Sequence, residues 1–151
     1  MKRNVRILIV DDEESIRMAT AAILEEEGYV VDTAANGKEA IEKSNANYYN
    51  VALIDYRLPD MEGTELLSSF RETTPKMVKV MVTGYPSLEN AVTSVNKGAD
   101  AFLMKPVSLE TLLKTIRELL QKQEEDQKYS KEKVAEFIET RFRELEGKIP
   151  S

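Results

Sequence analysis

Residues 51–59 read Val-Ala-Leu-Ile-Asp-Tyr-Arg-Leu-Pro, and this stretch decides the fold. Residues 51–54 are four consecutive apolar residues, which is typical of a central strand that helices cover on both faces of a parallel sheet. Asp55 ends the apolar run, and Pro59 cannot donate to a ladder of hydrogen bonds. We therefore predict a buried strand that presents the Asp55 carboxylate at its carboxyl end.

Similar short apolar runs alternate along the chain with amphipathic segments. They predict four further strands, at residues 5–10, 29–33, 77–82 and 101–104. Apolar residues at helical spacing predict helices at residues 13–27, 37–41, 66–70, 87–97 and 108–120. Five β/α repeats with right-handed crossovers predict an α/β fold: a doubly wound, five-stranded parallel sheet in the order 2-1-3-4-5, flanked by five helices. In the fourth helix, the spacing predicts that Leu88, Ala91, Val92 and Val95 face inward.

The composition excludes several kinds of chemistry. The chain has no cysteine and no histidine, which removes disulfides, thiolate or His-ligated metal sites and Ser-His triads. Its net charge is −6, from 27 acidic and 21 basic residues, which argues against direct binding of nucleic acid. No stretch approaches the ~18 apolar residues of a membrane span, and the first apolar run is too short for a signal peptide. We expect a cytoplasmic protein without a membrane partner.

Polar residues close the predicted strands. Asp11 and Asp12 follow the first strand, Asp55 ends the third, Thr83 follows the fourth and Lys105 follows the fifth. In the predicted sheet these ends meet at one edge. Three carboxylates at close quarters need a cation, and oxygen ligands suit Mg²⁺. A carboxylate can also be a phosphoryl acceptor, for which a hydroxyl and an ammonium group are suitable partners.

These strand ends belong to short motifs that occur in order on the expected elements: Asp11-Asp12, Asp55-Tyr56-Arg57-Leu58-Pro59 with Gly63, Thr83-Gly84 and Lys105-Pro106. Each motif alone is weakly specific, whereas the ordered set is highly specific. From about Arg3 to Leu120 the chain resembles the receiver domain of two-component response regulators, the CheY-like superfamily. Residues 83–85 and 98–102 are similar to receivers of transcriptional regulators. The resemblance implies a phosphoprotein of signal transduction that catalyses only its own phosphorylation and slow dephosphorylation.

The resemblance also implies how the site binds metal and phosphoryl groups. Asp55 would accept a phosphoryl group from a histidine kinase. Asp11, Asp12 and Asp55 would hold Mg²⁺, with the backbone carbonyl of Arg57 as a further ligand. Lys105 would pair with the phosphoryl group.

A switch is implied by the same resemblance. Thr83 would move to hydrogen-bond the phosphoryl group, and Phe102 matches the aromatic residue that turns inward as Thr83 moves. Ordinary core packing is the alternative role for Phe102. The Lys105–Pro106 peptide bond would be cis. The switched surface, formed by the fourth helix, the fifth strand and the fifth helix, would bind a downstream effector or output domain.

Two large residues flank the predicted phosphoacceptor. Arg57 lies two residues after Asp55, and Tyr85 lies two residues after Thr83. Both side chains are large enough to shield a phosphoryl group from water, which would lengthen the lifetime of the signal. The alternative is that both point to solvent.

The C-terminal segment differs from the repeats. We predict a receiver domain at residues 1–121, followed at 122–151 by a linker and an amphipathic helix with the apolar residues Val134, Phe137, Ile138, Phe142 and Leu145. This helix could bind a partner, form a phosphorylation-dependent homodimer or fold back on its own domain. Gln123, Gln127 and Ser130 interrupt a heptad that would continue from the fifth helix. The chain could also be part of a larger regulator with a DNA-binding or ATPase output domain.

Other classes with a similar strand pattern fit less well. An aspartate-nucleophile phosphatase needs a second aspartate two residues after the first, where this chain has Arg57. A flavodoxin needs a phosphate loop rich in Ser, Thr and Gly after the first strand, where residues 11–14 are all acidic. A P-loop nucleotidase needs glycines there, and none precedes Gly28.

Overall fold

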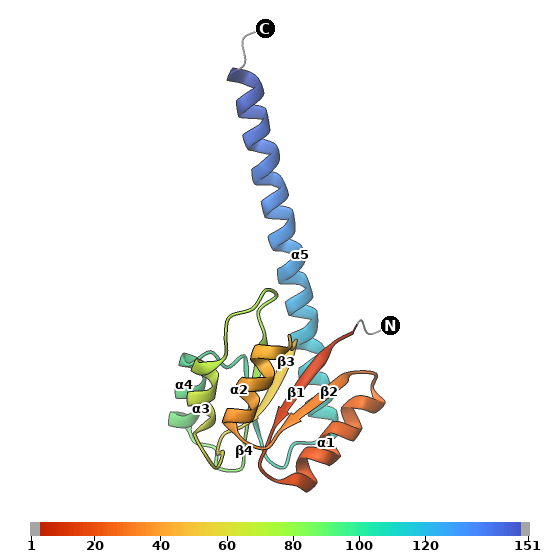
Figure 1. Cartoon of the computed structure of the whole chain (residues 1–151), viewed down its shortest axis with the longest axis vertical. Helices are drawn as coiled ribbons and strands as arrows, with labels where there is room; N and C mark the ends of the chain where they lie inside the picture. The colour runs from red at the N-terminus through yellow and green to blue at the C-terminus, as the bar shows by residue number, and fades with distance from the viewer. Residues whose placement is uncertain (1–3, 149–151) are drawn as a thin grey trace.

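The structure is a computed structural model that describes residues 4–148. Ten elements alternate strictly between strand and helix (Figure 1). The strands are β1 (Arg6–Val10), β2 (Val30–Ala34), β3 (Val51–Asp55), β4 (Val78–Thr83) and β5 (Ala101–Met104). The helices are α1 (Glu14–Glu26), α2 (Gly37–Ala46), α3 (Gly63–Ser69), α4 (Leu88–Asn96) and α5 (Leu109–Lys148).

All five strands are parallel and lie in the order β2-β1-β3-β4-β5, which confirms the predicted topology. β3 is central, and its residues 51–54 are buried on both faces, as the continuous apolar run predicted. One apolar cluster joins the sheet to α2 and α3, and a second joins its other face to α1 and α5. The fold is therefore a three-layer α/β sandwich.

Local sequence signals explain where the helices begin and end. Asn36 and Ser87 accept hydrogen bonds from the backbone N–H groups three residues later, which caps α2 and α4. Gly28 and Gly98 follow α1 and α4 with φ angles of 97° and 104°, a conformation that favours glycine. These signals fix the short connections at both ends of the sheet.

The prediction for the apolar face of α4 was wrong. Leu88, Val92 and Val95 are exposed, with exposed fractions of 83%, 49% and 61%, while Ser94 is fully buried. The side chain of Asn90 also faces the domain, where it accepts a hydrogen bond from the Tyr56 hydroxyl. A face of small and polar residues thus packs against the domain, and this leaves the apolar residues of α4 in solvent.

α5 is one continuous helix that extends far beyond the domain (Figure 1). The segment after residue 121, which the sequence left open as a linker or an exposed helix, is helical through Lys148. The apolar side chains of Val134, Phe137 and Phe142 are more than half exposed, so the fold-back alternative is wrong. The predicted domain limits at residues 1 and 151 lie outside the described residues. Among those residues, no helix is long and apolar enough to cross a membrane.

Candidate functional site

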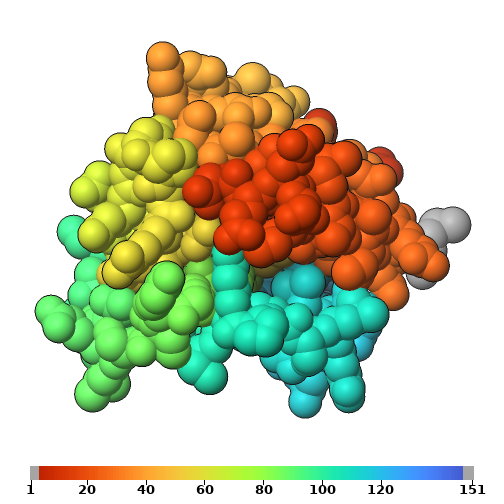
Figure 2. Space-filling model, turned by 90° about the horizontal axis from the view of Figure 1, so that it is seen from below, coloured from red at the N-terminus to blue at the C-terminus, as the bar shows by residue number. Residues whose placement is uncertain are grey.

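The carboxyl ends of the strands form the end of the molecule opposite the α5 extension. Seen from that end, segments from four parts of the chain meet: the red β1–α1 turn, the yellow loop after β3, the green loop after β4 and the cyan loop after β5 (Figure 2). Parallel strands direct all these loops to the same edge, which is where α/β sheets bind ligands. The predicted site residues lie in these four segments or in the strands that lead into them.

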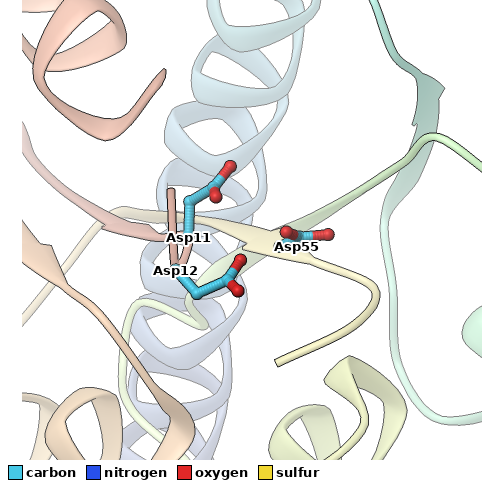
Figure 3. Close-up of side chains that lie close together, drawn as sticks. All are labelled: Asp11, Asp12 and Asp55. Carbon is cyan, nitrogen blue, oxygen red and sulfur yellow. The ribbon is translucent and has the colours of Figure 1, made fainter. Parts of the chain in front are cut away.

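Three carboxylates lie together at this edge (Figure 3). Asp11 and Asp12 follow β1, and Asp55 ends the neighbouring strand β3. Each residue offers an oxygen, and the three oxygens lie within 4.8 Å of one another. Asp11 is buried, Asp55 is half-buried and Asp12 is exposed. The sequence therefore predicted correctly that these residues converge.

Lys105 provides the positive charge of the cluster. Its Nζ lies 3.1 Å from Oδ2 of Asp11 and 3.3 Å from Oδ2 of Asp55. Its backbone N–H donates to the Thr83 carbonyl at 2.7 Å, which ties the loop after β5 to the end of β4. The Lys105–Pro106 peptide bond is cis, which confirms that prediction; Thr74–Pro75 is also cis.

The charges of the cluster shift two pKa values. Burial, together with the neighbouring carboxylate of Asp11, raises the pKa of Asp55 above its ordinary value, although Lys105 opposes the shift. Burial alone would lower the pKa of Lys105, but hydrogen bonds and charge from Asp11 and Asp55 hold it above its ordinary value. Lys105 is thus cationic at neutral pH, and the site favours additional positive charge near Asp55.

Thr83 and Phe102 occupy neighbouring strands. Thr83 is 1% exposed, and its Oγ1 accepts a hydrogen bond from the Tyr85 backbone N–H at 3.0 Å. Phe102 is half-buried and packs against the apolar cluster that contains Tyr56 and Met81. The hydroxyl of Thr83 is therefore engaged with its own loop in this structure, and Phe102 already contacts the domain interior.

Arg57 and Tyr85 lie against each other at the edge of the site. The Arg57 guanidinium carbon lies 4.7 Å from the centre of the Tyr85 ring, a cation–π contact. The backbone N–H of Arg57 donates to Oδ1 of Asp55 at 3.3 Å. Both side chains are exposed. The structure thus brings together two residues that the sequence could only place in separate loops.

Several contributors to the site were missed by the sequence analysis. The Tyr56 hydroxyl donates to Oδ1 of Asn90 at 3.0 Å, and Nδ2 of Asn90 donates to the Tyr85 carbonyl at 3.2 Å. Arg17 donates to the Asp11 carbonyl at 2.8 Å. Arg17 lies on α1 and Asn90 on α4, and no sequence motif marks either residue. The bond between Tyr56 and Asn90 joins residues 34 positions apart, and the other two bonds depend on how the loops before α1 and α4 fold.

The position of Gly63 has a steric reason. A Cβ at this position would lie 2.6 Å from the Asp55 carbonyl oxygen, far closer than any real Cβ contact. The backbone N–H of Gly63 donates to the Tyr56 carbonyl at 2.7 Å. The loop after β3 can therefore close on Asp55 only with glycine at this position.

Comparisons with known proteins agree on one family. The profile of the response regulator receiver domain matches residues 7–117. The transcriptional regulatory protein TrcR of Mycobacterium tuberculosis is 36% identical over 78% of this chain and 46% of its own length. The response regulator ArlR of Staphylococcus saprophyticus is 35% identical over 78% of this chain and 53% of its own length. The chain thus spans about half the length of these curated relatives.

Solved structures show the same similarity. A CheY-like response regulator receiver domain protein from Methanospirillum hungatei is 52% identical, with a TM-score of 0.78. The match covers 82% of this chain and 99% of that protein.

Proposed function

The chain belongs to the response regulator receiver family, and we propose that it works as a phosphorylation switch with Asp55 as the phosphoacceptor. The observation that carries the proposal is the contact of Asp55 with Lys105 beside Asp11 and Asp12. Response regulator receivers are signalling domains of two-component systems and not an enzyme family. In the proposed role, a histidine kinase donates the phosphoryl group, and an effector or output domain reads the result.

The cluster suits Mg²⁺ as its cofactor. Asp11, Asp12 and Asp55 offer only oxygen ligands, and their three negative charges exceed the single positive charge of Lys105. We propose that these carboxylates and the Arg57 carbonyl hold the ion. Bound there, Mg²⁺ would neutralise the carboxylates and bind phosphoryl oxygens.

In the proposed reaction, a carboxylate oxygen of Asp55 attacks the phosphorus of a phosphohistidine. An O–P bond forms, the N–P bond breaks, and its electron pair returns to the imidazole nitrogen. Lys105 stabilises the negative charge of the transferring group because its ammonium already contacts Asp55. Later attack by water on the acyl phosphate resets the switch.

The proposed switch couples Asp55 to α4. Thr83 would exchange its bond with the Tyr85 N–H for a bond to the phosphoryl group, and this would move the loop before α4. Asn90 already joins that loop to the residue after the phosphoacceptor. Phe102 would turn further inward as Thr83 moves. The apolar residues that α4 exposes, Leu88, Val92 and Val95, support the α4–β5–α5 face as the output surface.

Within this proposal, residues 1–121 form the receiver and residues 122–151 form a linker and a helical extension. The matched segment makes up only about half of each curated relative, which supports an output domain as one partner. We also propose that the protein is soluble and functions in the cytoplasm.

Incubation with acetyl phosphate and Mg²⁺, followed by intact-mass spectrometry, tests the function. We expect the parent protein to gain one phosphoryl group, and we expect omission of Mg²⁺ or the Asp55→Asn substitution to abolish the gain. An Asp126→Asn variant removes an exposed acid on α5 and should be labelled like the parent. Labelling of Asp55→Asn would show that another residue is the acceptor.

A further inference from the structure

The projecting part of α5 carries a stripe of large apolar side chains, defined here as Val134, Phe137, Ile138, Phe142 and Leu145. Their exposed fractions lie between 50% and 65%. They recur at intervals of three or four residues, so they lie along one side of the helix. No other described element lies beside this part of α5 (Figure 1). A long helix with an unpaired apolar side gains most of its stability from packing, so a partner for this stripe is expected.

The stripe continues the side of α5 that packs on the sheet. Val134 follows the buried Ile116 by eighteen residues, which is five full turns. Ile138 follows Leu120, which also packs on the domain, by the same interval. The domain covers this side of the helix as far as Gln123, whose Nε2 donates to the carbonyls of Asn50 and Lys76. The stripe begins about 16 Å further along the helix.

The charges around the stripe suit a partner of the same sequence. Residues 131–148 contain five basic and five acidic residues, so this segment has no net charge, whereas the whole chain carries −6. Two copies of the segment would therefore meet without net repulsion. A strongly acidic or basic partner would find no complementary field there.

We propose that the stripe pairs with the stripe of a second copy of this chain, with the two helices antiparallel. Packed helices lie about 8–10 Å apart. In a parallel pair, the earlier halves of both α5 helices would face each other at that distance, and each domain would have to occupy the space of the other. In an antiparallel pair only the extensions overlap, and the two domains lie at opposite ends.

The sequence of the extension fits the antiparallel register. With the two-fold axis between residues 139 and 140, Val134 lies opposite Leu145 of the second copy, and Phe137 lies opposite Phe142 of the second copy. Lys133 and Glu144 are eleven residues apart, about three turns, so both flank the stripe on the same side. In an antiparallel pair with two-fold symmetry, the same flank of the stripe from each helix lies along one edge of the interface. Each Lys133 then lies near Glu144 of the second copy.

This inference does not depend on phosphoryl transfer, because the stripe lies at the other end of the molecule from Asp55 (Figure 1). The unphosphorylated chain is therefore sufficient for the test. Asp55→Asn should associate as the parent does. Failure of the phosphorylation test and failure of the dimer test can thus be told apart.

Sedimentation equilibrium of the full chain tests the pairing. We expect a monomer–dimer equilibrium for the parent protein and a dissociation constant raised at least about tenfold by Phe142→Glu. Tyr129→Glu is the matched control, because Tyr129 is equally exposed but lies off the stripe, and it should behave as the parent. A parent that stays monomeric up to about 0.5 mM, or a dimer that survives Phe142→Glu unchanged, would overturn the proposal.

Cysteine cross-linking tests the orientation, since the chain has no cysteine of its own. Val134→Cys and Leu145→Cys variants are oxidised separately and as a mixture. An antiparallel pair predicts disulfide-linked dimers mainly in the mixture. Efficient self-linking of each variant alone would instead indicate parallel helices, and a dimer that links in none of the three samples would contradict the proposed register.

Discussion

The electrostatics of the candidate site centre on one half-buried carboxylate. Asp55 shares Lys105 with Asp11, so one ammonium group serves two acids. Burial and the charge of Asp11 together outweigh the attraction of Lys105 and raise the pKa of Asp55. The ionised form of Asp55 therefore costs stability, and a divalent cation bound as proposed would offset this cost.

The pKa shift predicts how Asp55→Asn changes stability with pH. A raised pKa in the folded state means that protonation of Asp55 favours folding. This contribution is fully present below the unfolded pKa, about 4, and is lost as the pH rises through the folded pKa. In EDTA at pH 7 we expect Asp55→Asn to raise the Tm by a few degrees. The expected rise is about 2–4 °C for each kcal/mol of unfolding free energy that the ionised carboxylate costs.

Thermal unfolding monitored by circular dichroism at several pH values checks this expectation. The gain should shrink toward pH 4, and Mg²⁺ should stabilise the parent more than the variant. Asp126→Asn removes an exposed acid and should leave the Tm almost unchanged. A gain that is equal at pH 4 and pH 7 would show that charge at Asp55 is not its cause.

The contact between Arg57 and Tyr85 bears on the lifetime of the phosphorylated state. We propose that the pair shields the phosphoryl group from water, since Arg57 is joined to Asp55 through its backbone and Tyr85 to Thr83. Arg57→Ala and Tyr85→Ala should each speed dephosphorylation by up to about tenfold, which is ~1.4 kcal/mol of barrier. Decay of the phosphorylated mass after removal of the donor measures the rate. Unchanged decay in both variants would mean that the pair lies only in solvent.

At the scale of the element, α4 shows why its orientation matters more than its apolar pattern. The helix is held by Asn90 and the buried Ser94, while Leu88 and Val95 remain exposed. The bond from Tyr56 to Asn90 links the start of α4 directly to the residue after Asp55. The side chain of Asn90 thus joins the first turn of α4 to Tyr56 and to the loop after β4, both of which lie next to the site.

Removal of the Tyr56 hydroxyl should loosen α4. Tyr56→Phe keeps the ring in the apolar cluster but leaves Asn90 without this donor, which should cost about 1 kcal/mol of unfolding free energy. Hydrogen exchange followed by mass spectrometry should show faster exchange in residues 88–96 and little change in α1. Tyr129→Phe is the control, since that side chain is exposed on α5. Equal exchange in parent and variant would show that other contacts hold α4.

At the scale of the whole molecule, the candidate site and the apolar stripe lie at opposite ends (Figure 1). α5 connects them, because its first turns pack on the sheet and its later turns project beyond the domain. Gln123 fixes the point of exit: it also accepts a hydrogen bond from Nδ2 of Asn50 at 3.2 Å. In the sequence, Gln123 was only a polar residue that interrupts the heptad pattern. In the structure its side chain is directed toward the domain, so it is not available to a second helix.

The sequence alone determined the order of the elements and the residues at the strand ends. Strand and helix periods are local properties, and the rules for parallel sheets leave few topologies for five β/α repeats. The convergence of Asp11, Asp55 and Lys105 follows from that topology, which is why those residues could be predicted from the sequence.

Only the tertiary structure decided which side of α4 faces the domain, that Arg57 contacts Tyr85, and that α5 remains helical through Lys148. An apolar pattern tells which side of a helix avoids water, but not whether the domain offers that side a partner. For α4, the side-chain contacts that the domain offers are polar. For the end of α5, the domain offers no contact. Contacts between residues far apart in sequence settle such choices, because packing and side-chain hydrogen bonds depend on the arrangement of the whole chain.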